Sequence, residues 1–300
     1  MAVKNMQASV LARLKQQAKA EGLPFQTVLQ LFCQEEFLRR LAKSRYVDNM
    51  ILKGGMFIYT LTEFASRPTK DIDFMIQRLS NELGQIQQTM EEICNIETGN
   101  DFISIEVLGT EQIAVEKKYP GVKTKFRSHI GNVRVPFSID IGIDDVIIPE
   151  PVKRKIATRL SDFEQPEIYT YSLESTIAEK LDAILQRMEA TSRMKDFYDL
   201  YYLSGIFDFD GSTLLKAVES TLKHRQRELK ETVFDEIRDF ADSNFLLTQW
   251  QAFEPAKESK LAFQDVLDRL EIFLRPIYES ILLHKDFKAK WESKAKKWLF

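Results

Sequence analysis

Apolar side chains recur at helical spacing near the start of the chain. Between residues 8 and 47, apolar positions return every three or four residues, as on one face of an α-helix. Gly22 and Pro24 interrupt this pattern. Because glycine weakens a helix and proline cannot donate a helical hydrogen bond, the pattern predicts two helices that separate at these residues.

The segment that follows mixes strand-like and helix-like patterns. Short apolar runs with alternating side chains predict strands, and a longer polar amphipathic stretch predicts a helix. A Gly-Gly pair follows the first apolar run and marks the turn into the next helix. The expected elements are a strand at 50–52, a helix at 56–64, a strand at 71–76, a helix at 79–96, and strands at 103–108 and 135–143.

Beyond Pro166 the pattern becomes that of long helices. We expect helices at 172–190, 193–203 and 211–223, and at least two more after Lys257. The whole chain therefore predicts a mixed α/β fold. Residues 1–165 would contain the sheet, and residues 166–300 would form a helical domain.

The C-terminal segment 284–300 is basic and aromatic. Its Trp291 and Trp298 stand two helical turns apart, so they would share one face of a helix. We therefore expect a docked C-terminal helix here, and not a surface on which bases stack.

Composition places the chain among ordinary globular proteins. With 300 residues, 44% hydrophobic and 29% charged, it can bury a sizeable core. The net charge of -3 argues against a protein held on nucleic acid by its overall field. Any contact with RNA or DNA must then come from local basic patches.

Cysteine usage and hydropathy exclude several further classes. The two cysteines, Cys33 and Cys94, cannot form a Cys-rich zinc site, and we expect them to be buried as small hydrophobic residues. No stretch of about 18 apolar residues occurs, and the N-terminus mixes charged with apolar residues. A cytoplasmic protein without membrane spans is expected.

Two aspartates spaced two residues apart suggest metal binding. Asp71 and Asp73 lie in the strand expected at 71–76, so both carboxylates project from one face. Such a pair can hold Mg²⁺ or Mn²⁺ ions that catalyse nucleotidyl transfer. Asp140 adds a third carboxylate in an otherwise mostly apolar strand, where burial is costly without a cation. An exposed strand end is the alternative explanation of the isolated Asp-x-Asp pattern.

Gly54 and Gly55 stand where the first apolar run ends and a helix begins. Backbone N–H groups and the helix dipole at such a point can hold a triphosphate. A plain Gly-Gly turn explains the pair equally well when it is taken alone. The order of glycine pair, helix, Asp-x-Asp and later strand aspartate is similar to the DNA-polymerase-beta type of nucleotidyltransferase.

Six segments together resemble the AbiEii/AbiGii toxins of bacterial type IV toxin-antitoxin systems. They are Ser9-Val-Leu-Ala-Arg-Leu14, Leu52-Lys-Gly-Gly55, Arg67-Pro-Thr-Lys-Asp-Ile-Asp73, Ile139-Asp-Ile-Gly142, Ala178-Glu-Lys-Leu181 and Arg193-Met-Lys-Asp-Phe-Tyr-Asp-Leu200. The resemblance covers residues 8–204. It implies a polymerase-beta-like nucleotidyltransferase core with N-terminal helices and a C-terminal helical domain.

The resemblance also implies the chemistry, which is metal-dependent transfer of a nucleoside monophosphate from an NTP with release of pyrophosphate. Asp71, Asp73 and Asp140 would bind Mg²⁺ or Mn²⁺, and Gly54 and Gly55 would hold the phosphates. The nucleotide would lie in the cleft between the two domains. An RNA acceptor, such as a tRNA 3′ end, and a cognate antitoxin would be the partners.

Further phosphate contacts are implied by the later segments. Helical spacing puts Lys180 on or beside an apolar stripe, so its ammonium points inward and needs an anionic partner. In the family this segment lines the nucleotide site, which implies that Lys180 contacts the triphosphate. Lys195 and Asp196 or Asp199 would complete the pocket. An ion pair of Asp196 with Lys180 or Arg193 is the structural alternative.

Basic residues elsewhere leave their role open. Arg67 and Lys70 could neutralise phosphate or only fix their loop, and Lys53 is equally ambiguous. Residues 117–134 hold six Lys or Arg and no acid, so this expected loop could steer a nucleic-acid acceptor toward the Asp140 strand. A solvated loop is the alternative, as it is for the run at 153–155 with Arg159. The six are Lys117, Lys118, Lys123, Lys125, Arg127 and Arg134.

Two other functions fit the same residues. The metal chemistry is indifferent to what carries the acceptor hydroxyl, so a protein side chain or a small molecule could be modified. A non-catalytic nucleotide-binding module is the third possibility. The three carboxylates, the two glycines and Lys180 argue against it.

Overall fold

The chain divides into two structural units. The computed structural model describes residues 6–113, 121–143 and 145–300. The predicted mixed α/β class is confirmed. The first unit consists of Met1–Asp144 and Pro151–Tyr171, and the second of Asp145–Glu150 and Ser172–Phe300.

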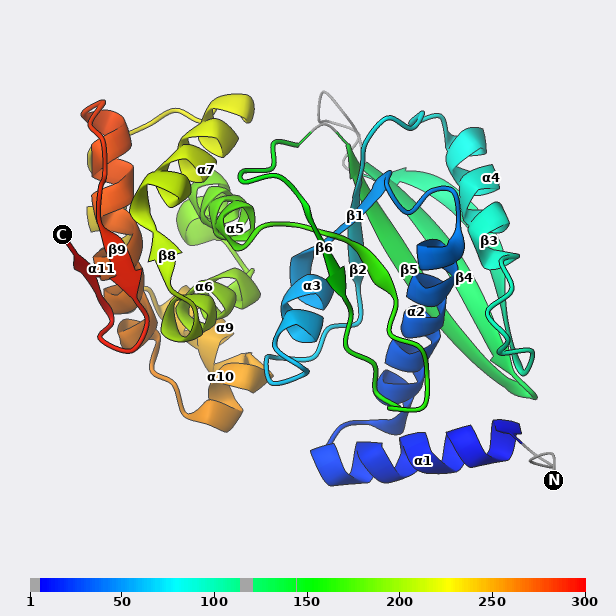
Figure 1. Ribbon diagram of the computed structural model, residues 1–300. Coiled ribbons are helices and arrows are strands. Elements are labelled where there is room, and N and C mark those ends of the chain that lie inside the picture. Colours follow the sequence, from blue (N-terminus) through cyan, green and yellow to red (C-terminus); the bar gives the residue numbers. More distant parts are fainter. Residues whose placement is uncertain (1–5, 114–120, 144) are drawn as a thin grey trace. The chain divides into compact units, whose positions relative to one another are not determined.

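A seven-stranded mixed sheet forms the centre of the first unit, with strand order β3-β4-β5-β2-β1-β7-β6 (Figure 1). β1 and β2 pair antiparallel, whereas β2 and β5 pair parallel. This places strands that are far apart in sequence side by side. The strands are β1 (Met50–Lys53), β2 (Ile72–Ile76), β3 (Ile103–Ile113), β4 (Gly121–Ile130), β5 (Val133–Ile143), β6 (Val152–Lys155) and β7 (Glu167–Thr170).

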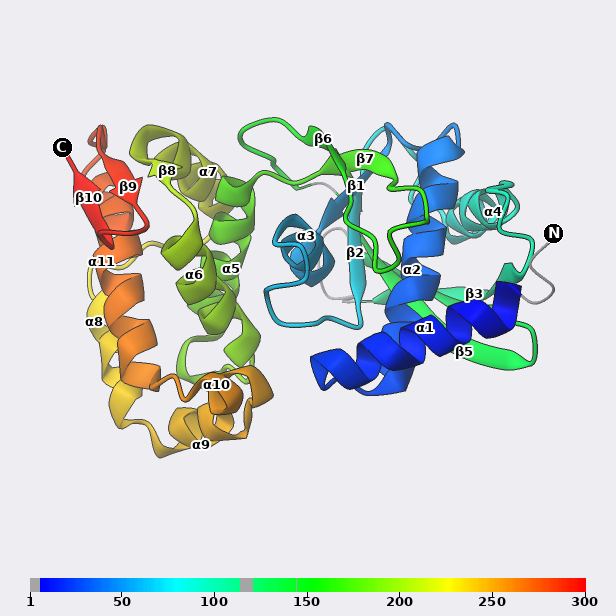
Figure 2. The same ribbon diagram turned by 60° about the horizontal axis from the view of Figure 1, so that its bottom comes forward.

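One face of this sheet is covered by α2, as Figures 1 and 2 show. The Phe37 ring of α2 packs against Phe74 of β2 and Phe126 of β4, with centroids 6.3 and 5.5 Å apart. The two predicted N-terminal helices are confirmed, and Gly22 between them has a φ of +68°. The helices of this unit are α1 (Met6–Glu21), α2 (Phe25–Lys43), α3 (Gly54–Leu61) and α4 (Leu83–Cys94).

The alternation predicted for β5 is confirmed. Phe137, Ile139 and Ile141 are buried on the face that α2 covers, while Ser138 and Asp140 are half-buried on the opposite face. The strand pairs with β2 on one side and with β4 on the other. A polar side chain of β5 therefore has direct neighbours on two strands.

The basic segment before β5 was expected to be a loop, and for residues 121–130 this expectation is wrong. These residues form β4, whose buried positions include Val122, Phe126 and Ile130. This apolar alternation drives strand formation, and the intervening basic side chains occupy the other face. Lys117 and Lys118 lie outside the described residues.

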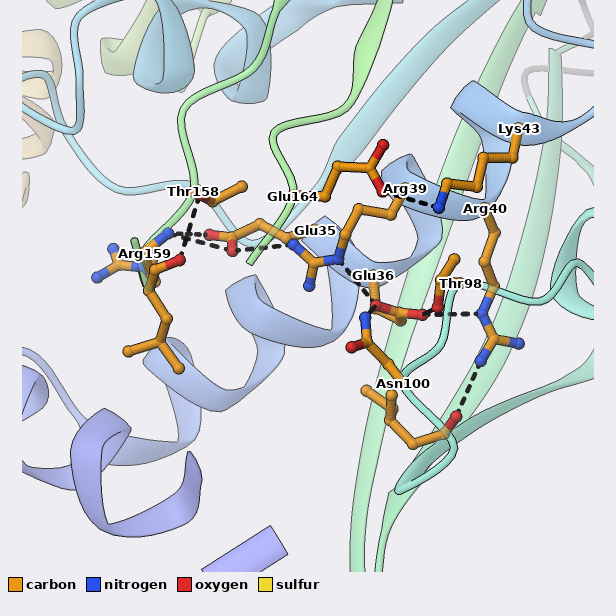
Figure 3. Close-up of polar contacts among 12 residues, drawn as sticks. Glu35, Glu36, Arg39, Arg40, Lys43, Thr98, Asn100, Thr158, Arg159 and Glu164 are labelled. Carbon is orange, nitrogen blue, oxygen red and sulfur yellow. Dashed lines mark hydrogen bonds and ion pairs between the residues drawn. The ribbon is translucent and has the colours of Figure 1, made fainter. Parts of the chain in front are cut away.

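A network of buried charges fixes α2 to the rest of the unit (Figure 3). We call Glu35, Glu36, Arg39 and Arg40 the α2 cluster. Arg39 Nε donates to Glu36 at 2.9 Å, and Arg40 Nη2 donates to the carbonyl of Ile103 at 2.8 Å. The cluster joins this helix to the start of β3 and to the segment that follows β6. Glu36 also accepts hydrogen bonds from Thr98 and Asn100, and Glu35 accepts one from the backbone N–H of Arg159.

Burial affects Glu35 most clearly. It raises the pKa of Glu35 to about 7, with Arg39 as the largest opposing influence. The outer nitrogens of Arg39 have no hydrogen-bond partner among the described residues. The guanidinium carbon lies 5.5 Å from the centroid of the Phe32 ring and 5.1 Å from that of the Phe163 ring, and Nη1 lies 3.9 Å from Glu35 Oε2. Cation–π contacts thus replace hydrogen bonds on that side.

The second unit is mainly helical, as predicted. Ser172 caps α5 by accepting a hydrogen bond from the N–H of Ser175, and Asp210 caps α7 in the same way through Thr213. No helix in the described ranges is long and apolar enough to cross a membrane. The elements are α5 (Leu173–Arg187), η1 (Met188–Ala190), α6 (Met194–Ile206), β8 (Phe209–Asp210), α7 (Gly211–His224), α8 (Val233–Arg238), η2 (Asp239–Asp242), α9 (Asn244–Ala252), α10 (Glu254–Ser259), α11 (Phe263–Leu282), β9 (Lys290–Glu292) and β10 (Lys297–Leu299).

The prediction for the C-terminus is wrong. After Lys257 one further α-helix begins, α11, and β9 and β10 then form a hairpin that joins β8. Trp291 and Trp298 are cross-strand partners, with ring centroids 5.4 Å apart. A separation of seven residues fits two helical turns, but it also fits opposite positions in a tight hairpin. Packing of both indoles on Phe273 of α11 favours the hairpin.

Candidate active site

Four charged residues form a row across the middle of the first unit's sheet. Lys53 of β1 is the register partner of Asp73 of β2, Asp73 is the partner of Asp140 of β5, and Asp140 is the partner of Lys123 of β4. Residues paired in this way project from the same face of a sheet. We call these four residues the charged row. It lies on the face opposite to α2.

Asp140 is the half-buried centre of this row. Its side chain is 28% exposed, but its Oδ1 atom is buried and lies 3.1 Å from Lys123 Nζ. This contact has ion-pair distance without hydrogen-bond geometry, since the Oδ1 atom has no hydrogen-bond partner among the described residues. The Asp140 carboxylate raises the pKa of Lys123, and Asp71 and Glu111 add to this effect. The Lys123 ammonium therefore stands among carboxylates where a metal cation could also stand.

The two aspartates before and within β2 differ in exposure. Asp71 is exposed and precedes the first strand residue, whereas Asp73 is half-buried. The preceding loop is held by α2, because the side chains of Gln30 and Gln34 donate to the carbonyl of Lys70 at 2.6 and 2.7 Å. This anchoring fixes the backbone at the point where Asp71 begins the strand. The Lys70 side chain itself is exposed.

The carboxylates do not form a ready-made metal centre. Across residues 6–113, 121–143 and 145–300, no group of three or more His, Cys, Asp or Glu side chains is arranged to hold a metal ion. The donor chemistry nevertheless fits Mg²⁺ or Mn²⁺, which prefer carboxylate oxygens. The buried Asp140 Oδ1 without a hydrogen bond fits a cation in the same way. Binding would require the side chains of Asp71, Asp73 and Asp140 to converge.

The glycine pair packs directly against this site. Gly54 has a φ of +67°, and an added Cβ there would overlap the carboxylate of Asp73. A Cβ on Gly55 would lie 2.9 Å from Thr69 Oγ1 and 3.6 Å from the Arg67 guanidinium. Both positions thus require glycine for close packing and not only for a turn. The N-cap residue of α3, Lys53, makes no side-chain capping hydrogen bond, and the helix begins beside Asp73.

Lys53 lies at the other end of the charged row. Its Nζ stands over the Tyr171 ring, 4.8 Å from the centroid and 3.4 Å from the hydroxyl oxygen. A Cβ on Gly142 would lie 3.8 Å from this ammonium, at ordinary van der Waals distance, so the ammonium lies beside Gly142 of β5. The aromatic ring and its hydroxyl thus hold a cation next to Asp73.

The basic face of β4 is matched by acids on β3. Lys125 pairs with Glu111 at 2.9 Å, and Arg127 pairs with Glu106 at 2.9 Å. These pairs are half-exposed or more, so each contributes little to stability. The face is a set of ion pairs and not an uncompensated positive patch. A polyanion would have to compete with two glutamates to reach these cations.

The basic run at 153–155 and the nearby Arg159 have different surroundings. The Arg154 guanidinium donates to Thr170 at 2.5 Å and lies over the Phe57 ring, whereas Arg159 is buried against Tyr59 and Glu21. These two arginines therefore pack within the unit. The other two basic residues, Lys153 and Lys155, line a pocket of about 580 Å³ together with Lys43, Glu164 and Glu167.

In the second unit, the predicted nucleotide contacts form a buried ion cluster. Lys180 Nζ lies 3.1 Å from Asp196 Oδ1 and 2.5 Å from Asp199 Oδ2, and Arg193 Nε lies 2.6 Å from Asp196 Oδ2. Burial alone would raise the pKa of Asp196, but Lys180 and then Arg193 outweigh it and lower that pKa. The ion pair considered as the alternative is therefore present. Contact of Lys180 with an NTP stays a prediction, as does that of Lys195, which is half-buried on α6.

Sequence patterns missed part of this arrangement. Lys123 was noticed only as one of several loop cations, although the alternation Val122, Thr124, Phe126 identifies a strand with Lys123 on its polar face. Its position beside Asp140 depends on strand register, which no local pattern gives. The glutamines of α2 that hold the Asp71 loop had no signal of their own.

Comparisons with known proteins bear on the family. The sequence family described as "Nucleotidyl transferase AbiEii toxin, Type IV TA system" matches residues 36–292. No curated protein matches the chain. Two Helicobacter pylori crystal structures are similar to it: one described as a candidate nucleotidyltransferase (15% identity, 88% of this chain and 100% of that one covered, TM-score 0.48), and one named JHP933 (14% identity, 86% and 94% covered, TM-score 0.48). Because the sequence match spans most of its length, the chain belongs to the AbiEii family of nucleotidyltransferase toxins of type IV toxin-antitoxin systems.

Proposed function

We propose that this nucleotidyltransferase moves a nucleoside monophosphate from an NTP to a hydroxyl of RNA, such as a tRNA 3′ end, with two divalent cations as cofactors. The observation that carries the metal site is the direct register of Asp73 with Asp140 on neighbouring parallel strands. Gly54 brings the start of α3 against the same Asp73 carboxylate. The carboxylates that would bind cations and the N–H groups that would bind phosphate are thus adjacent.

The carboxylates and the helix start have separable roles in this proposal. Mg²⁺ or Mn²⁺ held by Asp71, Asp73 and Asp140 would supply a clamp on the attacking and leaving oxygens. The acceptor hydroxyl oxygen attacks the α-phosphorus, the bond from that phosphorus to the bridging oxygen breaks, and pyrophosphate leaves. Asp140, at the centre of the row, accepts the hydroxyl proton. The N–H groups of Gly54 and Gly55 hold phosphate oxygens.

Cationic side chains complete the phosphate contacts. The guanidinium of Arg67 lies by Gly55 at the start of α3, which supports this role. Lys70 is exposed on the same loop. Lys180 and Lys195 of the second unit stay predicted contacts of the triphosphate, and the ion pair with Asp196 would orient the Lys180 ammonium for this role.

The biological role follows from the family. Transfer to an essential RNA would stop growth, and a cognate antitoxin would relieve it. A second acceptor class, proteins, is favoured by the pairing of Lys125 and Arg127 with glutamates. An acceptor without a polyanionic backbone, such as a protein hydroxyl, would not need these cations to be released.

A labelling experiment tests the proposal. The protein is incubated with each α-³²P-labelled NTP, Mg²⁺ or Mn²⁺, total RNA and a protein extract, and the labelled polymer is identified. We expect label in RNA, lost with EDTA and reduced about 1,000-fold or more in Asp73→Asn, because an amide cannot gather divalent cations. Label in protein would replace the RNA acceptor. Undiminished labelling by Asp73→Asn would refute the metal site.

A further inference from the structure

Lys123 is a cation with two acidic neighbours, one on each flanking strand. Across β4–β5 its register partner is Asp140, and across β3–β4 its register partner is Glu111. Its ammonium is on the Asp140 side, 3.1 Å from the buried Oδ1. Glu111 is occupied by Lys125 at 2.9 Å and has a half-exposed side chain. The lysine therefore has a second acceptor directly opposite the first.

The contact between Lys123 and Asp140 is weak enough to break. The Lys123 side chain is 29% exposed, and its contact lacks hydrogen-bond geometry on the Asp140 side. A lysine head is strongly hydrated and sits on a flexible stem, so leaving this position costs little. Lys180 in the second unit differs, because it is 9% exposed and hydrogen-bonded to two aspartates.

The same oxygen cannot serve both cations well. A divalent ion bound to Asp140 Oδ1 would stand within a few ångströms of the ammonium, and two positive charges at that distance repel. Without a metal, however, the buried oxygen of Asp140 needs a positive charge nearby. The ammonium supplies it.

We propose that Lys123 is an internal counter-cation that occupies the Asp140 side of the site in the metal-free protein and moves toward Glu111 when a divalent cation binds. This rests on the proposed function, because it takes Asp140 as a metal ligand. Lys123 is then a positioning residue that sets metal affinity: it lowers that affinity and compensates the charge of Asp140 when no metal is bound.

Mn²⁺ binding without nucleotide tests this directly, since free Mn²⁺ is counted by its paramagnetic resonance signal. Lys123→Met should bind Mn²⁺ about three- to tenfold more tightly than wild type, the range expected for a half-exposed ion pair. Arg127→Met is the matched control, because it loses the same charge on the same face and its partner Glu106 is not the proposed second acceptor. It should change Mn²⁺ affinity less than about twofold.

Glu111→Gln is a second variant at an exposed side chain, so it tests the proposal without risk to folding. It should weaken Mn²⁺ binding about two- to threefold by removing the second acceptor, whereas Glu106→Gln, with equal charge loss, should not. Lys123→Met should also lower the melting temperature without metal, with saturating Mn²⁺ closing the gap to wild type.

The outcomes separate this inference from the proposed function. If Asp73→Asn and Asp140→Asn bind Mn²⁺ as tightly as wild type, the metal site itself is wrong. If those two variants lose Mn²⁺ but Lys123→Met and Arg127→Met bind it equally, the counter-cation role is overturned. Equal effects of Glu111→Gln and Glu106→Gln would overturn the movement toward Glu111.

Discussion

The α2 cluster and the charged row contain similar side chains in opposite surroundings. In the α2 cluster, both glutamates are at most 3% exposed, and Glu36 accepts hydrogen bonds from Arg39 and Arg40 and from side chains outside the helix. In the charged row, Asp140 is 28% exposed and its buried oxygen lacks a hydrogen bond among the described residues. Both carboxylate oxygens of Glu36 are hydrogen-bonded within the fold, whereas the buried Oδ1 of Asp140 keeps an acceptor position that the proposed metal cation would use.

The largest expected effect is on the free energy of unfolding, when one carboxylate in each of the two regions is replaced by its amide. Glu36→Gln should lower the free energy of unfolding by about 3 kcal/mol or more, because it leaves Arg39 and Arg40 buried with less compensating charge. Asp140→Asn should change it by less than about 1 kcal/mol, since that pair is half-exposed. Urea titration measures both, and equal losses would erase the distinction between the regions.

The next effect is a pH dependence carried by Glu35. Burial raises the pKa of Glu35 from 4.5 to about 7. Between these two pH values, Glu35 is therefore protonated in the folded protein and ionised in the unfolded chain. A raised carboxyl pKa favours the folded state at low pH, and up to about 3 kcal/mol of that stability is lost as pH rises from 4.5 to 7. Glu35→Gln should remove this slope. A wild-type stability curve that is parallel to that of the variant from pH 4 to 8 would contradict the prediction.

Sequence patterns predicted helices and strands correctly where one buried face requires apolar residues at regular spacing. The helices of residues 8–47 and the alternation of β5 follow directly from one buried face. The same logic fails for β9 and β10, because three-residue strands give no period and Trp291 fits a helix equally well. In the site, sequence supplied the three aspartates and the glycine pair. It could not supply the neighbour of Asp140, since strand register decides which of several lysines stands there.

The third prediction concerns the buried ion cluster around Lys180 in the second unit. It tests whether these charges only stabilise the fold, like the α2 cluster, or also bind a ligand. Lys180→Met should weaken NTP binding about tenfold in a calorimetric titration if this ammonium contacts the triphosphate. The control is Arg227→Met, which breaks another ion pair in the same unit, with Asp182 at 2.8 Å. Both variants should lose stability, because each leaves a buried aspartate with less compensation. Equal NTP affinity in the two would make Lys180 structural, like the α2 cluster.

The smallest effect is expected on the basic face of β4, where Lys125 and Arg127 are already paired with Glu111 and Glu106. Replacing both cations by glutamine should raise the KM for RNA only a few-fold, because each phosphate contact first requires an ion pair to open. Lys123 is left intact, since its contact with Asp140 would mix acceptor binding with metal binding. The salt dependence is the sharper measurement. Each phosphate contact to a single strand contributes about 0.7 to the logarithmic salt slope, so losing two should flatten it by about 1.4. An unchanged slope together with an unchanged KM would show that these cations serve only the sheet, and that the acceptor approaches the charged row from elsewhere.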